Sequence, residues 1–435
     1  MKQVHVESLS SWFNILFEQS GVTNFQPFKK LAWDRLQEIG FPSKSSEAFQ
    51  YVSFRKLCES FPALESSVQH TSKSLDLTPF VLEESKESVI VLKDGIFCPE
   101  LSCIPASLIV YSLEEALKSS YSSFFKHRIQ GLIQQEKDPF ALLNASLCEG
   151  GVFIYAPAKT FLKVPIQILH IQTNPLLPYL GPRVHCFLGA QANIQIVSSF
   201  KNVCNESFST LYNDFFDVSL EEHSVFSHTF STEEDFSSWG FSSFKASLKK
   251  ESSLHSFFAT VGSPGFRRDY FISLLGERAC AHLNGLTALS SSFESHVHVH
   301  MDHSAPSCTS HQLFKNVLAG KSRSSFTGKI HVKRSAQKTE AYQLNQNLLL
   351  SDVAMANTKP SLEIFADDVK ASHGATVSQM DEEQLFYLKT RGVSSLEAKS
   401  LLLIGFCAEV LDKIPIKSLR EKLLSLCRLF LFAEE

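Results

Sequence analysis

The spacing of apolar residues divides the chain into three parts. Within residues 1–135, apolar residues recur mostly every three or four positions, as at Trp12 and Leu16. This spacing places them on one face of a helix. Two short runs, residues 88–91 and 107–111, have the apolar composition of strands instead. We therefore predict a mostly helical N-terminal region with short strands.

The middle part, residues 136–377, is dominated by short strand-like runs. Gly, Pro or Asn separates runs such as residues 152–155, 183–188 and 193–197. Such a long series of short strands without intervening helices is typical of a sandwich, a large barrel or a β-solenoid. The pattern alone leaves these three open, but a solenoid core grows turn by turn with chain length. We therefore favour a mainly β fold with a solenoid core.

The last part, residues 378–435, returns to helical spacing. Asp381 stands at the start of an acidic run that favours a helix N-terminus, and Ser394 and Glu397 have the spacing of a capping box. Pro415 marks a break before a third helix. An apolar helical hairpin at the end of a solenoid is expected to cap it or to dock a partner.

Composition and charge narrow the classes of function. The 435 residues are 44% hydrophobic and 20% charged, so the chain can bury a large core. A single compact core stops growing at roughly 250–300 residues, which calls for several domains or an elongated fold. The net charge of −4 offers no basic surface for nucleic acid or for an anionic membrane. With no signal-like N-terminus and no membrane-length apolar run, we expect a cytoplasmic protein.

The ten cysteines argue against a self-contained metal cluster. No two of them form a Cys-x-x-Cys pair, and the closest pair is Cys98 and Cys103. This spacing fits no common zinc or iron–sulfur ligand run. We interpret most of the scattered thiols as small buried hydrophobic residues.

The densest polar cluster lies within residues 294–311. On a strand, His296, His298 and His300 would share one face at about 7 Å spacing, where they could present imidazoles to a transition metal. The three cannot all reach one ion, because metal–nitrogen bonds are near 2 Å. A metal site would need further ligands from another turn, and a polar solenoid face is the simpler interpretation.

A second polar segment precedes the final helices. Asp367, Asp368 and Lys370 could act as an acid/base group, but neighbouring residues on a strand point to opposite faces. A solvated or turn-forming carboxylate is therefore the simpler interpretation. His373 is followed by Gly374, which lets a second backbone or a ligand approach the imidazole closely. His373 is thus a candidate functional residue.

The familiar catalytic motifs are missing. Residues 319–322 resemble the end of a phosphate loop, but Lys315 stands where that loop needs glycine. The chain has neither a Gly-x-Ser-x-Gly elbow nor a His-Glu-x-x-His motif. We therefore expect no independent catalytic centre.

A nearly continuous series of segments carries a specific pattern: residues 325–332, 336–343, 347–350, 359–364, 366–370, 372–376, 384–388 and 391–392. Weaker signatures stand at Pro139-Phe140 and Asn144. Together these segments resemble the SufB/SufD family of iron–sulfur cluster assembly proteins, and the resemblance covers most of the chain.

Within that family the chain resembles the D-type subunit. It is short, as D-type chains are, and Gly374 follows His373 where B-type chains usually carry glutamate. B-type chains also place an essential cysteine before this motif. Here no cysteine occurs between Cys308 and Cys407, so this chain cannot supply that thiolate.

The resemblance implies a fold, partners and a role. The fold is a right-handed parallel β-helix flanked by N-terminal and C-terminal α-helical regions. The partners are a SufB-like subunit, in a heterodimer, and a SufC-like ABC-type ATPase, which binds the C-terminal helices. The complex serves as a scaffold for a nascent, transient iron–sulfur cluster shared with the partner, and the ATPase activity lies in the SufC-type subunit.

His373 matches the histidine of D-type subunits at the heterodimer interface, where it is a candidate iron or cluster ligand. D-type chains commonly carry cysteine two residues earlier, where this chain has Ala371. We infer that this cysteine is dispensable or that the partner compensates for it. The resemblance leaves open whether a flavin binds.

Three alternatives are kept. The chain could be a SufB-like homodimeric scaffold, a β-helix enzyme that processes carbohydrate, or a metalloprotein that uses the histidine cluster. A carbohydrate enzyme would need acidic residues and aromatic platforms on one solenoid face.

Overall fold

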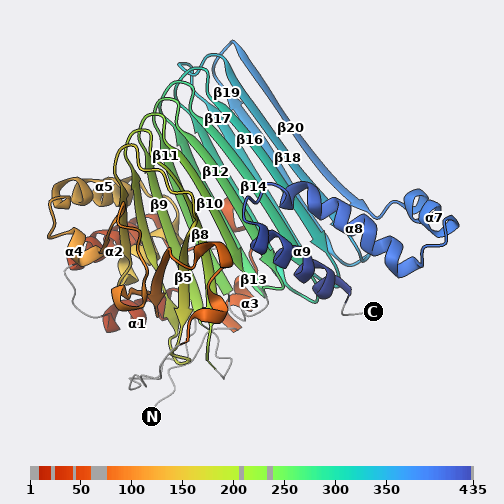
Figure 1. Ribbon diagram of the computed structural model, residues 1–435, viewed down its shortest axis with the longest axis horizontal. Helices are drawn as coiled ribbons and strands as arrows, with labels where there is room; N and C mark the ends of the chain where they lie inside the picture. Colours follow the sequence, from red (N-terminus) through yellow and green to blue (C-terminus); the bar gives the residue numbers. More distant parts are fainter. Residues whose placement is uncertain are drawn as a thin grey trace.

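The computed structural model describes residues 9–20, 25–42, 46–59, 76–204, 210–232 and 239–432. The protein is mainly β, with 42% strand and 28% helix, and its core is a β-solenoid of about seven turns. Helices lie at both ends of the chain (Figure 1). The predicted fold class, a solenoid with helical ends, is confirmed.

Two large sheets form the solenoid, and the chain alternates between them. Sheet A has the strand order β2 (Ile96–Phe97), β1 (Val89–Lys93), β5 (Ile166–Gln172), β8 (Asn193–Asn202), β10 (Val225–Thr232), β12 (Ser253–Val261), β14 (Cys280–Leu289), β16 (Thr309–Leu318), β18 (Thr339–Leu349) and β20 (Val369–Gln379). Sheet B has the order β19 (Met355–Ile364), β17 (Arg323–Val332), β15 (Glu294–His303), β13 (Gly265–Leu274), β11 (Trp239–Leu248), β9 (Leu211–Leu220), β7 (Arg183–Leu188), β4 (Val152–Ala156) and β3 (Ile109–Ser112), and β6 (Tyr179–Leu180) pairs with β9.

Parallel pairing stacks equivalent positions of successive turns above one another. Because side chains alternate between the two faces of a strand, each stacked row faces either the interior between the sheets or the outside. The interior rows are rich in phenylalanine, and the ring centroids of Phe258 and Phe266, from opposite sheets, lie 5.5 Å apart. Phenylalanine suits this interior because it buries a large apolar area and needs no hydrogen-bond partner.

N-terminal helices cover the outer face of sheet B. The buried residues Trp12 and Phe13 belong to a cluster that continues into the strands, and Phe140 stacks on Phe241 of β11 with centroids 3.5 Å apart. Asp138 caps the helix that begins at Pro139. The helices are α1 (Leu9–Gln19), α2 (Gln26–Ile39), α3 (Phe54–Glu59), α4 (Leu113–Ala116), α5 (Ser122–Gln135) and α6 (Pro139–Leu147).

The C-terminal helices are α7 (Glu382–Thr390), α8 (Ser395–Leu411) and α9 (Lys417–Phe432), which confirms the three predicted helices. Asp381 caps α7, and Ser394 with Glu397 forms the predicted capping box at the start of α8. α8 and α9 pack on the outer face of sheet A, where Cys407 and Leu403 join a cluster with Leu286 of β14. α7 extends past β20 at the end of the solenoid (Figure 1).

Among the residues that the structure describes, no helix is both long and apolar enough to cross a membrane.

Candidate functional site

The solenoid ends in two exposed strands. β19 and β20 are the terminal strands of sheets B and A, and each is hydrogen-bonded to a described strand on one edge only. Neither strand has a buried residue: β20 is largely exposed and β19 is half-buried to exposed, in contrast to the buried strands of the preceding turns. Large apolar side chains stand exposed here, among them Phe365 and Val377. Long, apolar edge strands are templates for pairing with another chain, so this end of the solenoid is a candidate interface.

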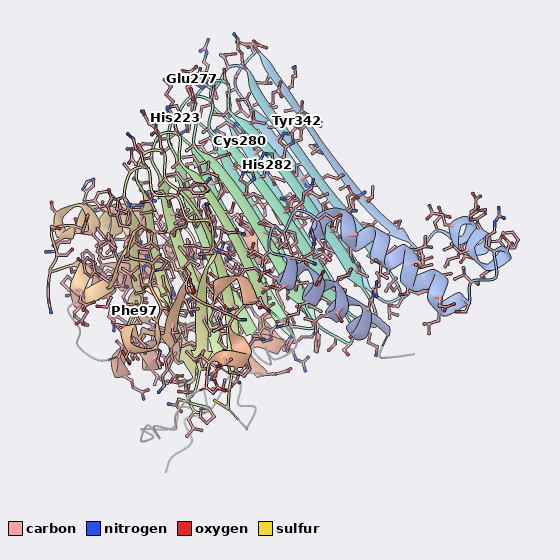
Figure 2. All side chains as sticks on the ribbon, viewed as in Figure 1. Phe97, His223, Glu277, Cys280, His282 and Tyr342 are labelled. Carbon is pink, nitrogen blue, oxygen red and sulfur yellow. The ribbon has the colours of Figure 1, made fainter. Side chains whose placement is uncertain are left out.

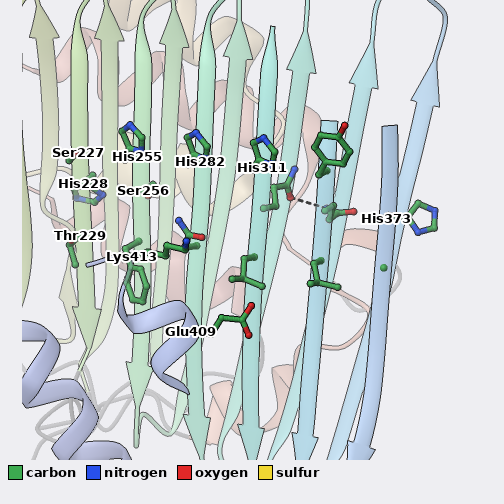
Figure 3. A pocket seen from close by; sticks show the side chains of 18 of the residues that line it. Ser227, His228, Thr229, His255, Ser256, His282, His311, His373, Glu409 and Lys413 are labelled. Atoms are coloured by element: carbon green, nitrogen blue, oxygen red, sulfur yellow. Dashed lines mark hydrogen bonds between the residues drawn. The ribbon is translucent and has the colours of Figure 1, made fainter. Parts of the chain in front are cut away.

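The structure places His373 on β20, within this open end. It pairs in register with Gln343 of β18, whose Nε2 donates to Gln312 Oε1 at 2.8 Å. His373 therefore stands at the end of a row of interior polar residues, but its own side chain is exposed (Figure 3). A Cβ on Gly374 would come within 3.1 Å of Leu344 Cδ1, so a larger residue here would require a small shift of that leucine side chain. The imidazole is thus presented outward on an edge strand.

The carboxylates next to His373 do not form an acid/base centre. Asp367 and Asp368 are exposed in the turn before β20, and the backbone N–H of Asp368 donates to Gln337 Oε1 at 3.0 Å. Lys370 is paired with Glu340, with Nζ and Oε1 3.0 Å apart. The solvated, turn-forming interpretation of these residues fits their positions.

A hollow of about 890 Å³ lies on the outer face of sheet A, bordered by the C-terminal end of α8. Rings from four successive strands stack along it: the centroid distances are 5.0 Å for His255 and His282, 5.2 Å for His282 and His311, and 5.1 Å for His311 and Tyr342. Figure 3 shows the three imidazoles side by side on neighbouring strands. We call His255, His282, His311 and Tyr342 the ring ladder.

The central ring of the ladder is neutral near pH 7. Burial, together with repulsion from His255, His311 and Lys413, lowers the pKa of His282 to about 4. Sequence reasoning missed this row. Its signal was the spacing of 27 and 29 residues between the three histidines, which equals one solenoid turn once the register is known.

The histidine cluster of β15 lies on the outer face of sheet B, and its members bind separate partners. His296 Nδ1 is 2.8 Å from Ser325 Oγ, and His298 Nδ1 is 3.1 Å from Asp269 Oδ1. Asp302 contacts His331 at 2.7 Å and Lys333 at 2.9 Å. Within the described ranges, no group of three His, Cys, Asp or Glu side chains is placed to hold a metal ion. The geometry therefore gives the shared metal site no support and fits the polar-face interpretation.

Most of the cysteines stay apart in the structure, but Cys407 of α8 and Cys427 of α9 are in contact within one buried cluster. All ten are free thiols, and Cys148, Cys186, Cys308, Cys407 and Cys427 are buried. Ala371, where D-type chains commonly carry cysteine, packs against the interior cluster on the same face of β20 as His373.

Comparison with known proteins covers almost the whole chain. Residues 172–406 match the family model described as "SUF system FeS cluster assembly, SufBD core domain", and residues 13–168 match the "SufBD protein N-terminal region". An "Iron-sulfur cluster assembly SufBD family protein" of Synechocystis is 27% identical over 97% of this chain and 96% of its own length.

Two further relatives align over most of their length. The "Iron-sulfur cluster assembly protein SufD" of Escherichia coli is 26% identical, with 96% of this chain and 95% of that protein covered. The Arabidopsis thaliana protein "Protein ABCI7, chloroplastic" is 28% identical over 89% of this chain and 82% of its own length.

Proposed function

The chain belongs to the SufBD family of iron–sulfur cluster assembly proteins, and from this we propose that it is a non-catalytic scaffold subunit of D type. It pairs with a SufB-like subunit, recruits a SufC-like ATPase and acts in the cytoplasm. The observation that carries this proposal is the open end of the solenoid. Two long edge strands, exposed apolar side chains and an outward imidazole occur together there.

The role proposed for His373 is to bind iron or one corner of a nascent cluster. Imidazole is a suitable ligand for iron, and a single protein ligand from each side allows the cluster to leave later. No cysteine occurs between Cys308 and Cys407, and position 371 is alanine. The thiolates must therefore come from the partner across the interface. The cluster is cargo of the complex and is not a resident cofactor.

Exposed apolar side chains support the role proposed for the C-terminal helices. None of the described residues of α7 is buried, and Phe386 and Tyr387 project from it into solvent. α8 carries Leu396 and Leu401, which are also exposed. A helix pair with exposed apolar side chains is a common docking surface. We assign it to the SufC-like ATPase.

Two alternative functions, a carbohydrate-processing enzyme and a SufB-like homodimer, make different structural predictions. A glycosidase needs two carboxylates that flank the scissile bond, but Glu409 is the single acidic residue among those that line the hollow on sheet A. A SufB-like homodimer would use the same open end, with a second copy of this chain as partner. The identity of the bound partner therefore separates the heterodimer from the homodimer.

The test is the variant His373→Ala, expressed together with the SufB-like and SufC-like subunits of the same organism. We expect the complex to assemble normally but to retain several-fold less iron and acid-labile sulfide after anaerobic reconstitution. His223→Ala serves as the control, because His223 is a half-exposed histidine on a distant turn that pairs with Glu251. A wild-type content of iron and sulfide in His373→Ala would disprove the ligand role.

A further inference from the structure

A thiol and an imidazole lie side by side on the outer face of sheet A, away from His373. Cys280 begins β14, and His282 follows on the same face of the strand. The distance from Cys280 Sγ to His282 Nε2 is 3.3 Å. Figure 2 labels both residues next to each other on the sheet. Both side chains are partly exposed, and His282 lines the hollow that contains the ring ladder.

This separation suits two ligands of one tetrahedral metal ion. Zinc–sulfur bonds are about 2.3 Å and zinc–nitrogen bonds about 2.0–2.1 Å. At a tetrahedral angle, the sulfur and nitrogen bound to one ion stand about 3.5 Å apart. The pair therefore needs almost no movement to bind an ion of this kind.

Both atoms can serve as metal ligands. A neutral imidazole nitrogen binds an ion directly, and the thiol releases its proton into solvent as the metal–sulfur bond forms.

The surroundings leave the other coordination positions open. Across the described ranges, no third His, Cys, Asp or Glu already converges with this pair. His255 and His311 flank His282 on neighbouring strands, at ring-centroid distances of 5.0 and 5.2 Å. Both flanking rings are exposed and face the same hollow.

We propose that Cys280 and His282 form a site for a divalent transition-metal ion of the zinc, cobalt or ferrous class, with its remaining coordination positions open to the hollow. β14 is three strands from β20, which corresponds to about 14 Å across the sheet. His373 borders the same hollow, but this distance keeps its imidazole out of reach of an ion held by Cys280 and His282. The proposed site therefore lies within one chain and is distinct from the role proposed for His373. It can be tested without any partner or cluster, so its failure would not bear on the scaffold role.

The test uses Co²⁺ as the probe on the purified, reduced full-length chain. Thiolate coordination gives Co²⁺ an intense sulfur-to-metal charge-transfer band, and the tetrahedral geometry gives strong visible absorption. We expect the wild-type chain to show both as it binds one Co²⁺, and Zn²⁺ to abolish them by displacement. Cys280→Ser should remove the charge-transfer band, and His282→Gln should weaken binding at least about tenfold.

Two controls make the outcome decisive. Cys103→Ser removes an exposed thiol whose Sγ donates to the carbonyl oxygen of Glu87, and it should leave the band unchanged. Thermal unfolding of each variant shows whether the fold is intact, and His282→Gln provides a second variant if Cys280→Ser is unstable. A band that persists in Cys280→Ser, or a wild-type chain that gives no band with Co²⁺, would overturn the proposal.

Discussion

Individual buried acids depend on their partners to remain charged, and Asp138 and Asp217 show the two outcomes. Asp217 is fully buried, but Arg128 donates to both of its carboxylate oxygens, at 2.5 and 3.0 Å, and His185 lies 3.2 Å away. These partners outweigh burial and hold the pKa of Asp217 far below its ordinary value. At Asp138 burial prevails, and with the nearby Asp269 and Glu136 it raises the pKa to about 7.

The Asp138 side chain makes two hydrogen bonds, which predict the effect of replacing it. Its Oδ1 accepts from the Phe140 backbone N–H at 3.0 Å, and its Oδ2 accepts from Ser243 Oγ at 2.5 Å. Asparagine keeps the cap of α6, and its Nδ2 can donate to Ser243. We therefore predict that Asp138→Asn stabilises the protein at alkaline pH but not at acidic pH.

The direction of this pH dependence follows from the linkage between proton binding and folding. The folded state holds the Asp138 proton up to about pH 7, whereas the unfolded chain releases it near the ordinary aspartate pKa of 3.8. The wild type therefore loses stability as pH rises through this window, by up to about 1.4 kcal/mol per pH unit. Urea unfolding at pH 4, 6 and 8 measures the difference, with Asp381→Asn, an exposed helix cap, as control. A difference between Asp138→Asn and wild type that is constant across this range would contradict the prediction.

Single elements differ in how much of their surface the rest of the chain covers. α6 is buried along its whole length, whereas none of the described residues of α7 is buried. Phe386 on α7 is 70% exposed, and α7 extends beyond the last strand of sheet A (Figure 1). An apolar ring so exposed on a projecting helix is better explained by binding than by folding.

We predict that Phe386→Asp combined with Tyr387→Asp weakens binding of the SufC-like ATPase at least about tenfold, because charge replaces apolar contact. Co-purification and titration by calorimetry measure the loss. Phe161→Asp is the matched control, since Phe161 is 62% exposed near the opposite end of the solenoid. Undiminished ATPase binding by the double variant would exclude α7 as the docking element.

Deleting α8 and α9 would be a poorer test, because both pack on sheet A and their loss would expose Leu286.

At the scale of the whole molecule, periodicity predicted the solenoid and the terminal helices, because both depend on local sequence. It missed α6, whose residues are apolar on all sides since the helix is buried on all sides. It also could not show that β1 pairs with β5, which follows it only after more than 70 residues. Pairing of this kind is decided by contacts distant in sequence.

The candidate sites also divide into those that the local sequence could identify and those that required the pairing of strands. His373 could be found because its neighbours carry a family resemblance, and the structure places it on an exposed edge strand. The ring ladder needed the register between turns of unequal length. The Cys280–His282 pair lies within one strand, so alternation of side chains along β14 is enough to place both residues on one face. The histidines of β15 share a face as expected, but partners on adjacent strands, such as Asp269 for His298, could not be read from their own strand.

The two ends of sheet A give the last prediction, because each terminal strand carries an apolar side chain of similar exposure. Val377 on β20 is 47% exposed, and Ile96 on β2, at the other end, is 50% exposed. A lysine on an edge strand opposes pairing with another strand, because its charge would have to be buried in the new sheet. We predict that Val377→Lys weakens binding of the SufB-like subunit at least about tenfold and that Ile96→Lys has little effect.

Co-expression followed by size-exclusion chromatography measures the fraction of chain in the heterodimer, and circular dichroism checks that the solenoid persists in both variants. Loss of the heterodimer in Ile96→Lys but not in Val377→Lys would place the interface at the β2 end of sheet A and contradict the prediction. A second outcome is that the chain forms a homodimer without any partner and that Val377→Lys dissociates this homodimer. The interface would then be the same edge strand, but the protein would be a homodimeric scaffold. The position of the interface and the identity of the partner are thus decided by one pair of substitutions.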